Sequence, residues 1–587
     1  MATNKINPAD FKIQIDNLYS YFERGKNLYG DKTLYRFNQK TTGQTVEVSY
    51  REMFDLITDL TFAFQKKGLE GKRVILIGET TVQWIASYLA TVTADGVIVP
   101  LDPHLLEEEI IKFTKLTKAS VVICSKTYAD MFKNHEDELD GVEYFIVTDR
   151  ETFSLDPEQE YVEEKFTTFN NFLALGKYLA KNTDMVINTR DRDVKKLSIL
   201  LFTSGTTGSS KGVMLCERNI CAVLEGIYPM LAGLTPEDSV MSVLPIYHTY
   251  EMSAGILAPM LYGMTINISD GIKYVGKNIK QFKPSVMTLV PLFANQLYKT
   301  IQKNVKKQGK EKALATGMKI SNFLLKLHID ARKKLFGEVL QGLGGNLKAF
   351  IVGGAALNPQ VAENFANFGI QIRQGYGITE CAPLISVVPL HEKNNPASCG
   401  KLMPGMQIYI DKEKSTDTFG EIVVKGDNVM LGYFENPEET AKVLSPDGWF
   451  KTGDYGYIDD EGYIYITGRK KNVIVLQGGK NVFPEELEEY LENVELIEEV
   501  VVIGDEDKET GAVSVVALVY PNHEECTKLG LVEEQDIYSA INDEIQKINK
   551  RLASYKHINR LELRAEPFEK TTSRKIKRHT IKKEAQA

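Results

Sequence analysis

The sequence contains no uninterrupted apolar run of the roughly 20 residues that a membrane-spanning helix requires. Its longest apolar window, residues 82–101, is interrupted by Asp95 and Pro100. The first sixteen residues carry charges and have no apolar core, so we expect no signal peptide. A net charge of −9 gives no general reason to expect nucleic-acid binding. The composition therefore predicts a soluble globular protein that does not bind nucleic acid.

Cysteines are few and scattered, and no two of them form a CxxC pair. Cys216 and Cys221 are the nearest to each other, but they lack the further ligands that a zinc site needs. Reduced thiols in a cytoplasmic protein are the expected state. The sequence leaves the oligomeric state open. The six cysteines are Cys124, Cys216, Cys221, Cys381, Cys399 and Cys526.

With 587 residues, the chain is too long for one ordinary domain, and its first two hundred residues alternate strand-like and helix-like segments. A buried strand is expected at 73–78, a helix at 82–90 and a second strand at 96–100. Alternation of this kind is typical of a mostly parallel α/β sheet. The pattern resumes at 196–202 and at 347–352.

Between about residues 400 and 468, the sequence pattern changes to short strands and tight turns, which favours a small β-barrel or an antiparallel sheet. Strands and a helix then begin again after Gly468. We therefore predict an α/β fold with two domains. The large N-terminal domain (1–469) has stacked α/β subdomains plus a small β-barrel, and the smaller, mobile α+β C-terminal domain covers 470–587.

A strand followed by a loop of small polar residues and a lysine occurs at 200–215, LLFTSGTTGSSKGVML. Glycines let several backbone N–H groups point toward one place, and hydroxyls and Lys211 add donors and positive charge, which suits phosphate oxygens. The loop is not a Walker A motif, because Ser210 and Gly212 break that pattern. A flexible turn of small residues is the structural alternative. The candidate phosphate-binding residues are Thr203, Ser204, Gly205, Thr206, Thr207, Gly208 and Lys211.

This loop resembles the signature loop of the adenylate-forming superfamily, which comprises acyl- and aryl-CoA synthetases, firefly luciferase and peptide-synthetase adenylation domains. The segment 374–383, QGYGITECAP, is similar to that superfamily's adenine and magnesium motif. The resemblance implies that Tyr376 offers an aromatic face to a purine, that Thr379 meets the α-phosphate and that Glu380 binds Mg²⁺. Gly375 and Gly377 would allow the nucleotide to approach closely.

Two further segments are similar to nucleotide-binding motifs of the same superfamily. The segment 352–357, VGGAAL, resembles the strand end whose backbone lines the adenine pocket, with Gly354 and Ala355 at that place. In the segment 452–454, TGD, Asp454 matches the aspartate that binds both ribose hydroxyls. A carboxylate suits this role because it can accept two hydrogen bonds. Arg469 matches an arginine that approaches the ribose and phosphate. A surface turn is the structural alternative for Asp454.

The C-terminal segment EKTTSRKIKR resembles the superfamily's closing motif, usually PxTxxGKIxR. On that alignment, Lys575 bridges the substrate carboxylate and the α-phosphate, where a positive charge offsets the negative charge that builds up. Lys570 and Lys577 remain alternatives, as does a solvated basic tail. The two departures from the pattern are Glu569, in place of proline, and Arg574, in place of glycine.

The resemblance also implies a rotation of the C-terminal domain between two half-reactions, with Lys471 at the hinge. The segment 478–484, GGKNVFP, is similar to the strand that the superfamily presents to the active site when the thioester forms. Lys480 would then contact coenzyme A phosphates, unless it is simply a solvated turn lysine.

The segment 244–252, LPIYHTYEM, matches the motif that borders the acyl pocket, which makes His248 a catalytic-site candidate, although a lone histidine is usually structural. The tryptophan that gates the acyl tunnel in some long-chain enzymes is absent from it. Together with the insertion at 299–348, the chain looks most like bacterial long-chain fatty acyl-CoA synthetases. The insertion holds twelve Lys/Arg and three Asp/Glu and has apolar residues at helical spacing. It therefore predicts peripheral contact with an anionic membrane, with a solvated helix face as the alternative.

The resemblance implies that the chain uses ATP and Mg²⁺ to adenylate a fatty acid and then transfers the acyl group to coenzyme A. It implies no covalent enzyme nucleophile, and the sequence offers no GxSxG motif to supply one. An acyl-[acyl-carrier-protein] ligase and a CoA ligase for an aromatic or medium-chain acid are the enzymatic alternatives. A non-catalytic nucleotide- or fatty-acid-binding scaffold is the alternative outside enzymes.

Overall fold

The computed structural model divides into two compact units. The first contains residues 1–203, 211–407 and 425–448, and the second contains 204–210, 408–424 and 449–587. The residues described are 11–189, 191–203, 210–414, 417–477, 480–507, 513–570, 576–578 and 580–581. Among them, the longest and most apolar helices still fall short of what a membrane crossing needs.

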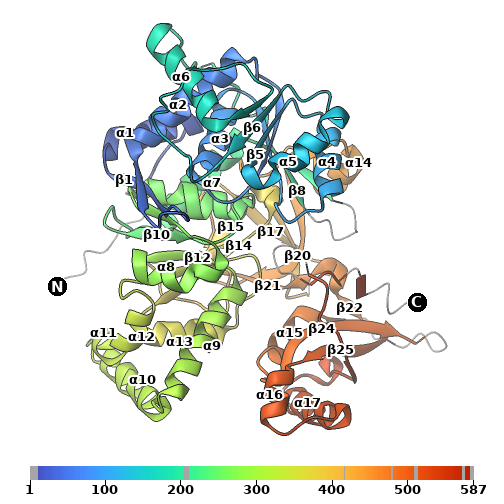
Figure 1. Ribbon diagram of the computed structural model, residues 1–587. Coiled ribbons are helices and arrows are strands. Elements are labelled where there is room, and N and C mark those ends of the chain that lie inside the picture. Colours follow the sequence, from blue (N-terminus) through green and yellow to red (C-terminus); the bar gives the residue numbers. More distant parts are fainter. Residues whose placement is uncertain are drawn as a thin grey trace. The chain divides into compact units, whose positions relative to one another are not determined.

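The first unit is built on two large, mostly parallel sheets (Figure 1). The nine-stranded sheet has the order β16 (Lys401–Leu402), β15 (Leu384–Val387), β14 (Gln371–Gly377), β13 (Ala349–Val352), β12 (Val286–Leu289), β10 (Ser239–Ser242), β11 (Thr265–Ile268), β1 (Thr33–Asn38), β2 (Thr45–Ser49). The eight-stranded sheet has the order β19 (Gly432–Tyr433), β9 (Lys211–Cys216), β8 (Leu197–Thr203), β4 (Val97–Pro100), β3 (Arg73–Ile77), β5 (Val121–Ser125), β6 (Tyr144–Thr148), β7 (Phe166–Thr168).

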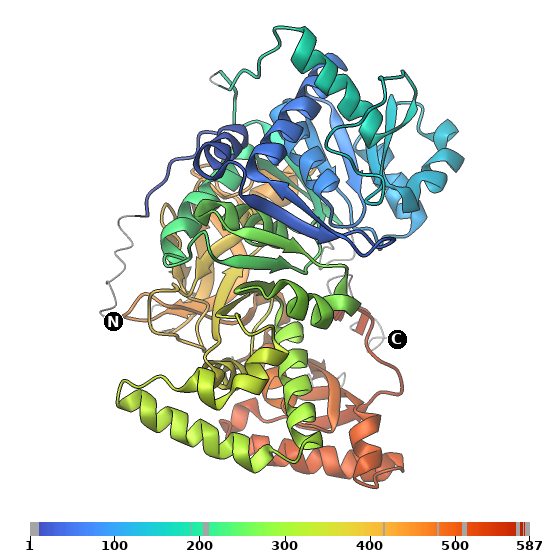
Figure 2. The ribbon, with the colours of Figure 1, turned by 60° about the vertical axis from the view of Figure 1, so that its left-hand side comes forward.

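Helices connect most of these strands, as the alternating pattern of the sequence predicts. In Figure 2, α6, in teal, lies along α2, in blue. The helices of the first unit are α1 (Leu18–Tyr29), α2 (Tyr50–Lys66), α3 (Val82–Thr93), α4 (Glu107–Leu116), α5 (Lys126–Asn134), α6 (Phe169–Asn182), α7 (Glu217–Met230), α8 (Val275–Phe282), α9 (Pro291–Lys307), α10 (Glu311–Lys326), α11 (Arg332–Leu335), α12 (Gly337–Gly342), α13 (Pro359–Phe368) and α14 (Pro437–Val443).

Local sequence explains where these helices begin and which side they bury, as α2 illustrates. Ser49 and Glu52 form a capping box: the Ser49 hydroxyl accepts from the Glu52 N–H at 3.2 Å, and the Ser49 N–H donates to the Glu52 carboxylate at 2.7 Å. Met53, Ile57 and Leu60 follow at helical spacing and are at most 1% exposed. The insertion predicted at 299–348 is likewise helical, divided among the end of α9 and α10, α11 and α12.

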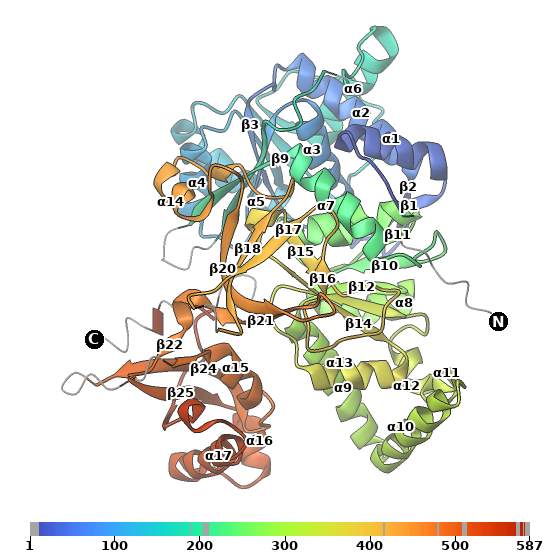
Figure 3. The same cartoon turned by 180° about the vertical axis from the view of Figure 1, so that it is seen from behind.

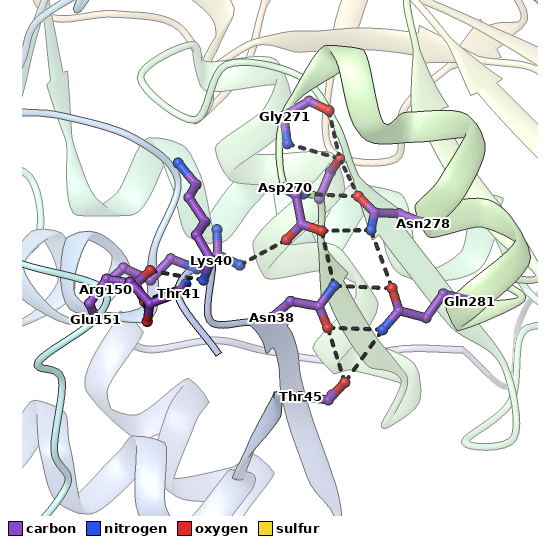
Figure 4. Close-up of polar contacts among 11 residues, drawn as sticks. Asn38, Lys40, Thr41, Thr45, Arg150, Glu151, Asp270, Gly271, Asn278 and Gln281 are labelled. Carbon is purple, nitrogen blue, oxygen red and sulfur yellow. Dashed lines mark hydrogen bonds and ion pairs between the residues drawn. The ribbon is translucent and has the colours of Figure 1, made fainter. Parts of the chain in front are cut away.

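A polar network joins the two sheets of the first unit where β6 and β11 end (Figure 4). Asp270 accepts hydrogen bonds from Asn38 at 2.9 Å and Asn278 at 2.8 Å, and it pairs with Arg150 at 3.5 Å. Gln281 exchanges two further amide hydrogen bonds with Asn38, at 2.9 and 3.0 Å. The carboxyl ends of parallel strands are the edge at which open α/β sheets bind ligands, so this network fixes the two sheets close to that edge.

The second unit contains a four-stranded sheet and a C-terminal α+β region (Figure 3). The four strands are β17 (Gln407–Asp411), β18 (Gly420–Lys425), β20 (Phe450–Ile458) and β21 (Ile464–Arg469), in that order. Within the described residues, the strand order is that of an open sheet in which β18, β20 and β21 pair antiparallel, so the antiparallel sheet is the one of the two predicted forms that is seen there. The chain connects the first two strands of this sheet through a segment that is only partly described.

The C-terminal region continues with short strands, a three-stranded sheet and further helices. These are β22 (Ile474–Val475), β23 (Asn481–Val482), α15 (Pro484–Leu491), β24 (Ile497–Glu506), β25 (Val513–Pro521), α16 (His523–Lys528), α17 (Glu534–Asn549) and β26 (Arg560–Leu563). Val502, Ala517 and Ile541 lie in its own apolar core. The predicted mixed α/β fold, with a large N-terminal and a smaller C-terminal part, is therefore confirmed. The boundary at 469/470 stays a prediction.

Candidate active site

The lysine that ends the predicted phosphate loop lies at the start of β9, opposite the last residue of β8. Thr203 and Lys211 are direct partners in this antiparallel pair, and the Thr203 hydroxyl donates to the Lys211 carbonyl at 3.4 Å. The other predicted loop residues lie outside the described residues: Ser204, Gly205, Thr206, Thr207 and Gly208.

The side chain of Lys211 is linked through Tyr433 to Glu380, the predicted metal-binding residue. Its Nζ lies 4.8 Å from the centre of the Tyr433 ring, a cation–π distance. The Tyr433 hydroxyl in turn donates to Glu380 Oε1 at 2.9 Å. Two motifs that are far apart in the sequence, the end of the phosphate loop and the ITE segment, therefore come together in the first unit.

Lys211 also forms an ion pair with Glu439, at the start of α14. The Nζ–Oε2 distance is 2.6 Å, and the two side chains are 22% and 31% exposed. Lys211 and then Lys442 lower the pKa of Glu439 to about 2. The carboxylate therefore stays charged at any physiological pH and holds a lysine that an anionic ligand would also attract.

Glu380 is positioned by the end of β14 and by a close hairpin with β15. A Cβ added to Gly377 would lie 1.8 Å from the Pro383 carbonyl oxygen, so only glycine fits there. A turn of 3₁₀-helix, Thr379–Cys381, follows directly, and the Met430 N–H donates to the Glu380 carbonyl at 2.8 Å. Thr379 and Glu380 are both half-buried.

A largely apolar cavity of about 70 Å³ lies beside these residues, between the ends of β13 and β14. It brings together residues of three predicted motifs. A cavity of this volume has room for a few water molecules. Its lining includes Tyr250, Gly353, Gly354, Gly375, Tyr376 and Gly377.

The predicted residues near this cavity differ in how far they are buried and in whether they line it. Tyr376 is buried within the lining, whereas Ala355, next to Gly354, is exposed. Among the described residues, His248 is not part of the lining, and Tyr250 from the same motif takes that place. His248 is half-buried, with its ring 4.4 Å from that of Tyr247.

A fully buried carboxylate, Glu251, lies next to Tyr250. It accepts hydrogen bonds from the Ser242 hydroxyl at 2.5 Å and from the Thr288 hydroxyl at 2.8 Å, at or near the ends of β10 and β12. Burial raises its pKa to about 7, although these hydroxyls oppose the shift. The Tyr250 hydroxyl donates to the Ile351 carbonyl at 2.8 Å, so this short segment connects three adjacent strands.

In the second unit, the two predicted ribose-binding residues form an ion pair. Asp454 and Arg469 lie opposite each other on β20 and β21, with Arg469 Nε 2.8 Å from Asp454 Oδ1. The Asp454 side chain is 5% exposed, and its backbone N–H donates to the Thr452 hydroxyl at 3.1 Å. The neighbouring pair of Lys470 and Glu421 is 2.7 Å long. Asp454 is thus a buried acid and not a solvated turn residue.

The lysines predicted to act late in the reaction also belong to the second unit. Lys471 is exposed in a 3₁₀ turn after β21, and Lys480 lies 4.6 Å from the centre of the Tyr555 ring. Lys575 lies outside the described residues. Both alternative lysines form ion pairs within the same unit, Lys570 with Glu499 and Lys577 with Glu569.

Tyr433 and Glu439 are candidate-site residues that the sequence did not single out. Each is separated from its partner by a long stretch of chain, 53 residues for Tyr433 and Glu380 and 228 for Lys211 and Glu439. The only local signal was a tyrosine after Gly432, shortly before a helix start rich in glutamate.

Comparisons with known proteins find similar ligases and a similar fold. The curated long-chain-fatty-acid–CoA ligase 5 of Rattus norvegicus is 28% identical, over 94% of this chain and 84% of that protein. A chloroplastic long-chain-fatty-acid–[acyl-carrier-protein] ligase of Arabidopsis thaliana is 25% identical, over 86% and 76%. The crystal structure of ATP-bound MatB from Rhodopseudomonas palustris shares the fold, with a TM-score of 0.71 over 97% of this chain and 99% of that one, at 22% identity.

Family models match most of the chain. The AMP-binding enzyme model matches residues 22–434, which include Lys211, Glu380 and Tyr433. The model of the AMP-binding enzyme C-terminal domain matches residues 471–587. The chain therefore belongs to the AMP-binding enzyme family, whose adenylate-forming members activate acids with ATP.

Proposed function

We propose that this enzyme is a long-chain fatty acid–CoA ligase that forms AMP. In the first half-reaction, a fatty acid carboxylate oxygen attacks the α-phosphorus of ATP. The bond to pyrophosphate breaks, and pyrophosphate leaves with the electron pair. In the second, the coenzyme A thiol attacks the acyl carbonyl carbon, AMP leaves with the electron pair of the broken C–O bond, and the thiol proton passes to solvent.

The contact of Lys211, Tyr433 and Glu380 is the observation that carries this proposal. It joins a lysine suited to phosphate oxygens with a carboxylate suited to a hard cation. Mg²⁺ is usually held by one or two protein carboxylates together with substrate phosphates, and Glu380 fits that need. When it is bound, the ion neutralises part of the negative charge of the phosphates. Lys211 would hold phosphate oxygens, and Tyr433 would keep the Glu380 carboxylate in place.

Lys575 is the lysine proposed to act between the two reacting anions. The alignment with the closing motif supports this choice, and the rival Lys570 is held in an ion pair with Glu499, whose side chain is 10% exposed. The chain on either side of 571–575 is anchored: Phe568 is 4% exposed, and Arg578 pairs with the buried Glu488. Anchoring on both sides would limit where the Lys575 ammonium can be placed.

The acid and the acceptor are proposed from the relatives that the chain resembles. A ligase for long-chain fatty acids is named in both curated relatives, which differ in using coenzyme A or acyl carrier protein. Coenzyme A is favoured because further relatives with that acceptor, from Bacillus subtilis and Mycobacterium bovis, are 29% and 26% identical. The ligase for acyl carrier protein is the second candidate.

ATP–pyrophosphate exchange across acids from acetate to oleate tests the proposal. We expect exchange to rise with chain length, and thioester formation to require coenzyme A and not holo acyl carrier protein. A flat profile, or turnover with the carrier protein alone, would contradict the assigned acid or acceptor.

Single lysine variants test the catalytic assignment. Lys575→Ala should lower exchange by about a thousandfold while ATP binding by calorimetry is retained, because the lost charge acts in the transition state. Lys570→Ala and Lys577→Ala are matched controls and should keep exchange within about threefold. Exchange retained by Lys575→Ala would assign the role to another lysine.

A further inference from the structure

Helix α10 presents an apolar face to solvent. Ile320, Phe323 and Leu327 are 45%, 62% and 54% exposed, and they follow one another at spacings of three and four residues. Residues at this spacing lie on one side of a helix. Just beyond the helix, Ile329 is 52% exposed and Leu335 is 38% exposed. Large apolar side chains scattered singly are ordinary, but a continuous row of them on one helix indicates a surface for interaction.

The exposed row is separate from the side of α10 that packs on the protein. Leu314 and Met318 pack against the apolar core that also contains Phe336, and Ser321 is 1% exposed. At about 100° per residue, these core-facing positions lie on the side of the helix opposite Ile320 and Phe323. The helix therefore has one apolar side that supports the fold and a second one that the fold does not need.

A row of lysines runs beside the exposed apolar face. Lys312, Lys319 and Lys326 are seven residues apart, which is close to two helical turns, so they form a line along one flank. All three are exposed, and within the described residues none of them belongs to an ion pair. Lys333 and Lys334 continue the positive charge next to Leu335.

We propose that α10 docks the first unit on an anionic lipid bilayer. Phe323, Ile320 and Leu327 enter the boundary between headgroups and acyl chains, and the lysine row contacts lipid phosphates. Their long side chains can place an ammonium at headgroup level while the apolar row goes deeper. In the ribbon, α10 lies at the periphery of its unit (Figures 1 and 3).

A bilayer fits this face better than a folded protein partner does. A helix of sixteen residues is about 24 Å long, and its exposed row is one side chain wide. A stable protein interface usually buries about 800 Å² on each partner, whereas a bilayer accepts a narrow apolar row without shape complementarity. The excess of positive charge in the segment, twelve against three, selects an anionic lipid surface. Docking does not depend on which acid the enzyme activates.

Vesicle flotation of the full chain tests the proposal. We expect binding to vesicles of phosphatidylcholine with about a third phosphatidylserine, weak binding to pure phosphatidylcholine, and loss of most binding when salt rises from about 0.1 to about 0.5 M. The triple variant Lys312→Glu, Lys319→Glu, Lys326→Glu should bind at least tenfold more weakly. Ile320→Ser, Phe323→Ser, Leu327→Ser should do the same at low salt.

A matched charge control comes from α8 and the turn before it. Lys273, Lys277 and Lys280 are exposed, and changing all three to Glu alters the net charge by the same amount. This control should keep at least half of the wild-type binding. ATP–pyrophosphate exchange with a water-soluble short acid should be unchanged in every variant, which shows that the variants are folded.

Fluorescence of a Phe323→Trp variant reports insertion directly. Its emission should shift to the blue and become protected from acrylamide on addition of anionic vesicles, since the side chain is exposed in their absence. Failure of the wild type to float with anionic vesicles would overturn the proposal. Equal loss of binding in the α8 control would also overturn it, since net charge and not α10 would then be responsible. Self-association that the serine variant abolishes, without vesicle binding, would replace it by a protein interface.

Discussion

The two ion pairs among the candidate site residues differ in how far their carboxylates are buried. The Asp454 side chain is 5% exposed where it meets Arg469, whereas the Glu439 side chain is 31% exposed where it meets Lys211. Leaving a buried carboxylate such as Asp454 without its partner is costly, although Arg469 itself is 42% exposed, while a pair exposed on both sides contributes little to stability. We infer that Asp454 and Arg469 stay together through the reaction cycle, whereas Lys211 can exchange Glu439 for a phosphate.

Replacing Asp454 provides the largest test of this difference. Asp454→Ala should lower ATP–pyrophosphate exchange by about two to three orders of magnitude, because it removes the carboxylate proposed to hold the ribose and also the partner of Arg469. The measurement is kcat/KM for ATP, with circular dichroism to check the fold.

The matched control for Asp454 lies in the same sheet. Glu421 is also buried and pairs with Lys470, and Glu421→Gln keeps an oxygen to accept from the Gly453 N–H. We expect this variant to retain exchange within about threefold. Comparable losses in the two variants would mean that the sheet needs its buried acids for folding, and that Asp454 has no special part.

Glu251 extends the comparison to a carboxylate that is completely buried. Its pKa is raised to about 7 from an ordinary value near 4.5, so the folded state favours the neutral acid. The stabilisation that it supplies is therefore fully present below about pH 4.5 and is lost as the pH rises through about 7. A shift of this size corresponds to about 3 kcal/mol in the free energy of unfolding of the first unit.

Glu251→Gln should remove this pH dependence, because the amide cannot ionise. We expect the variant to have a higher Tm than the wild type at pH 8 and a similar or lower one at pH 5, measured by calorimetry. Glu108→Gln, at an exposed position on α4, serves as the control and should follow the wild-type curve at both pH values. A wild-type Tm that increases steadily from pH 5 to 8, with the variant parallel to it, would contradict the prediction.

The sequence predicted what is local in this fold and in this site. Gly377 and Glu380 lie in one short segment, and the turn needed there leaves a readable pattern of glycines and a carboxylate. The strands at 73–78 and 96–100 are likewise recognisable from their apolar runs, and both exist as β3 and β4. The motif that contains Tyr250 was found, although His248 rather than Tyr250 was expected beside the pocket.

What the sequence could not predict depends on contacts between distant segments. Tyr433 reaches Glu380 only because β19 pairs with β9, a pairing that no local pattern encodes. The same holds for α10, where helical spacing predicted an amphipathic helix but not which of its two apolar sides packs on the core. Phe323 is one of the helically spaced apolar residues of the insertion, and it is exposed. A period of 3.6 residues indicates a helix and its sides, while the neighbouring elements decide which side is buried.

The exchangeable pair of Lys211 and Glu439 gives the smallest expected effects, and they have opposite signs. Lys211→Ala should raise the KM for ATP about tenfold, because a phosphate-binding charge is lost. Glu439→Gln should instead lower the KM for ATP by about threefold, since the amide no longer competes with phosphate for the lysine. Steady-state exchange at several ATP concentrations measures both.

Ionic strength separates this competition from a general change in charge. The benefit of Glu439→Gln should shrink as salt screens the half-exposed pair, and it should vanish in the Lys211→Ala background, where no lysine remains to be released. Glu438→Gln, on the neighbouring residue of the same helix start, changes the net charge equally and should leave the KM unaltered. If Glu439→Gln raised the KM for ATP, the carboxylate would be holding Lys211 in its binding position, and this pair would be as fixed as that of the buried Asp454 with Arg469.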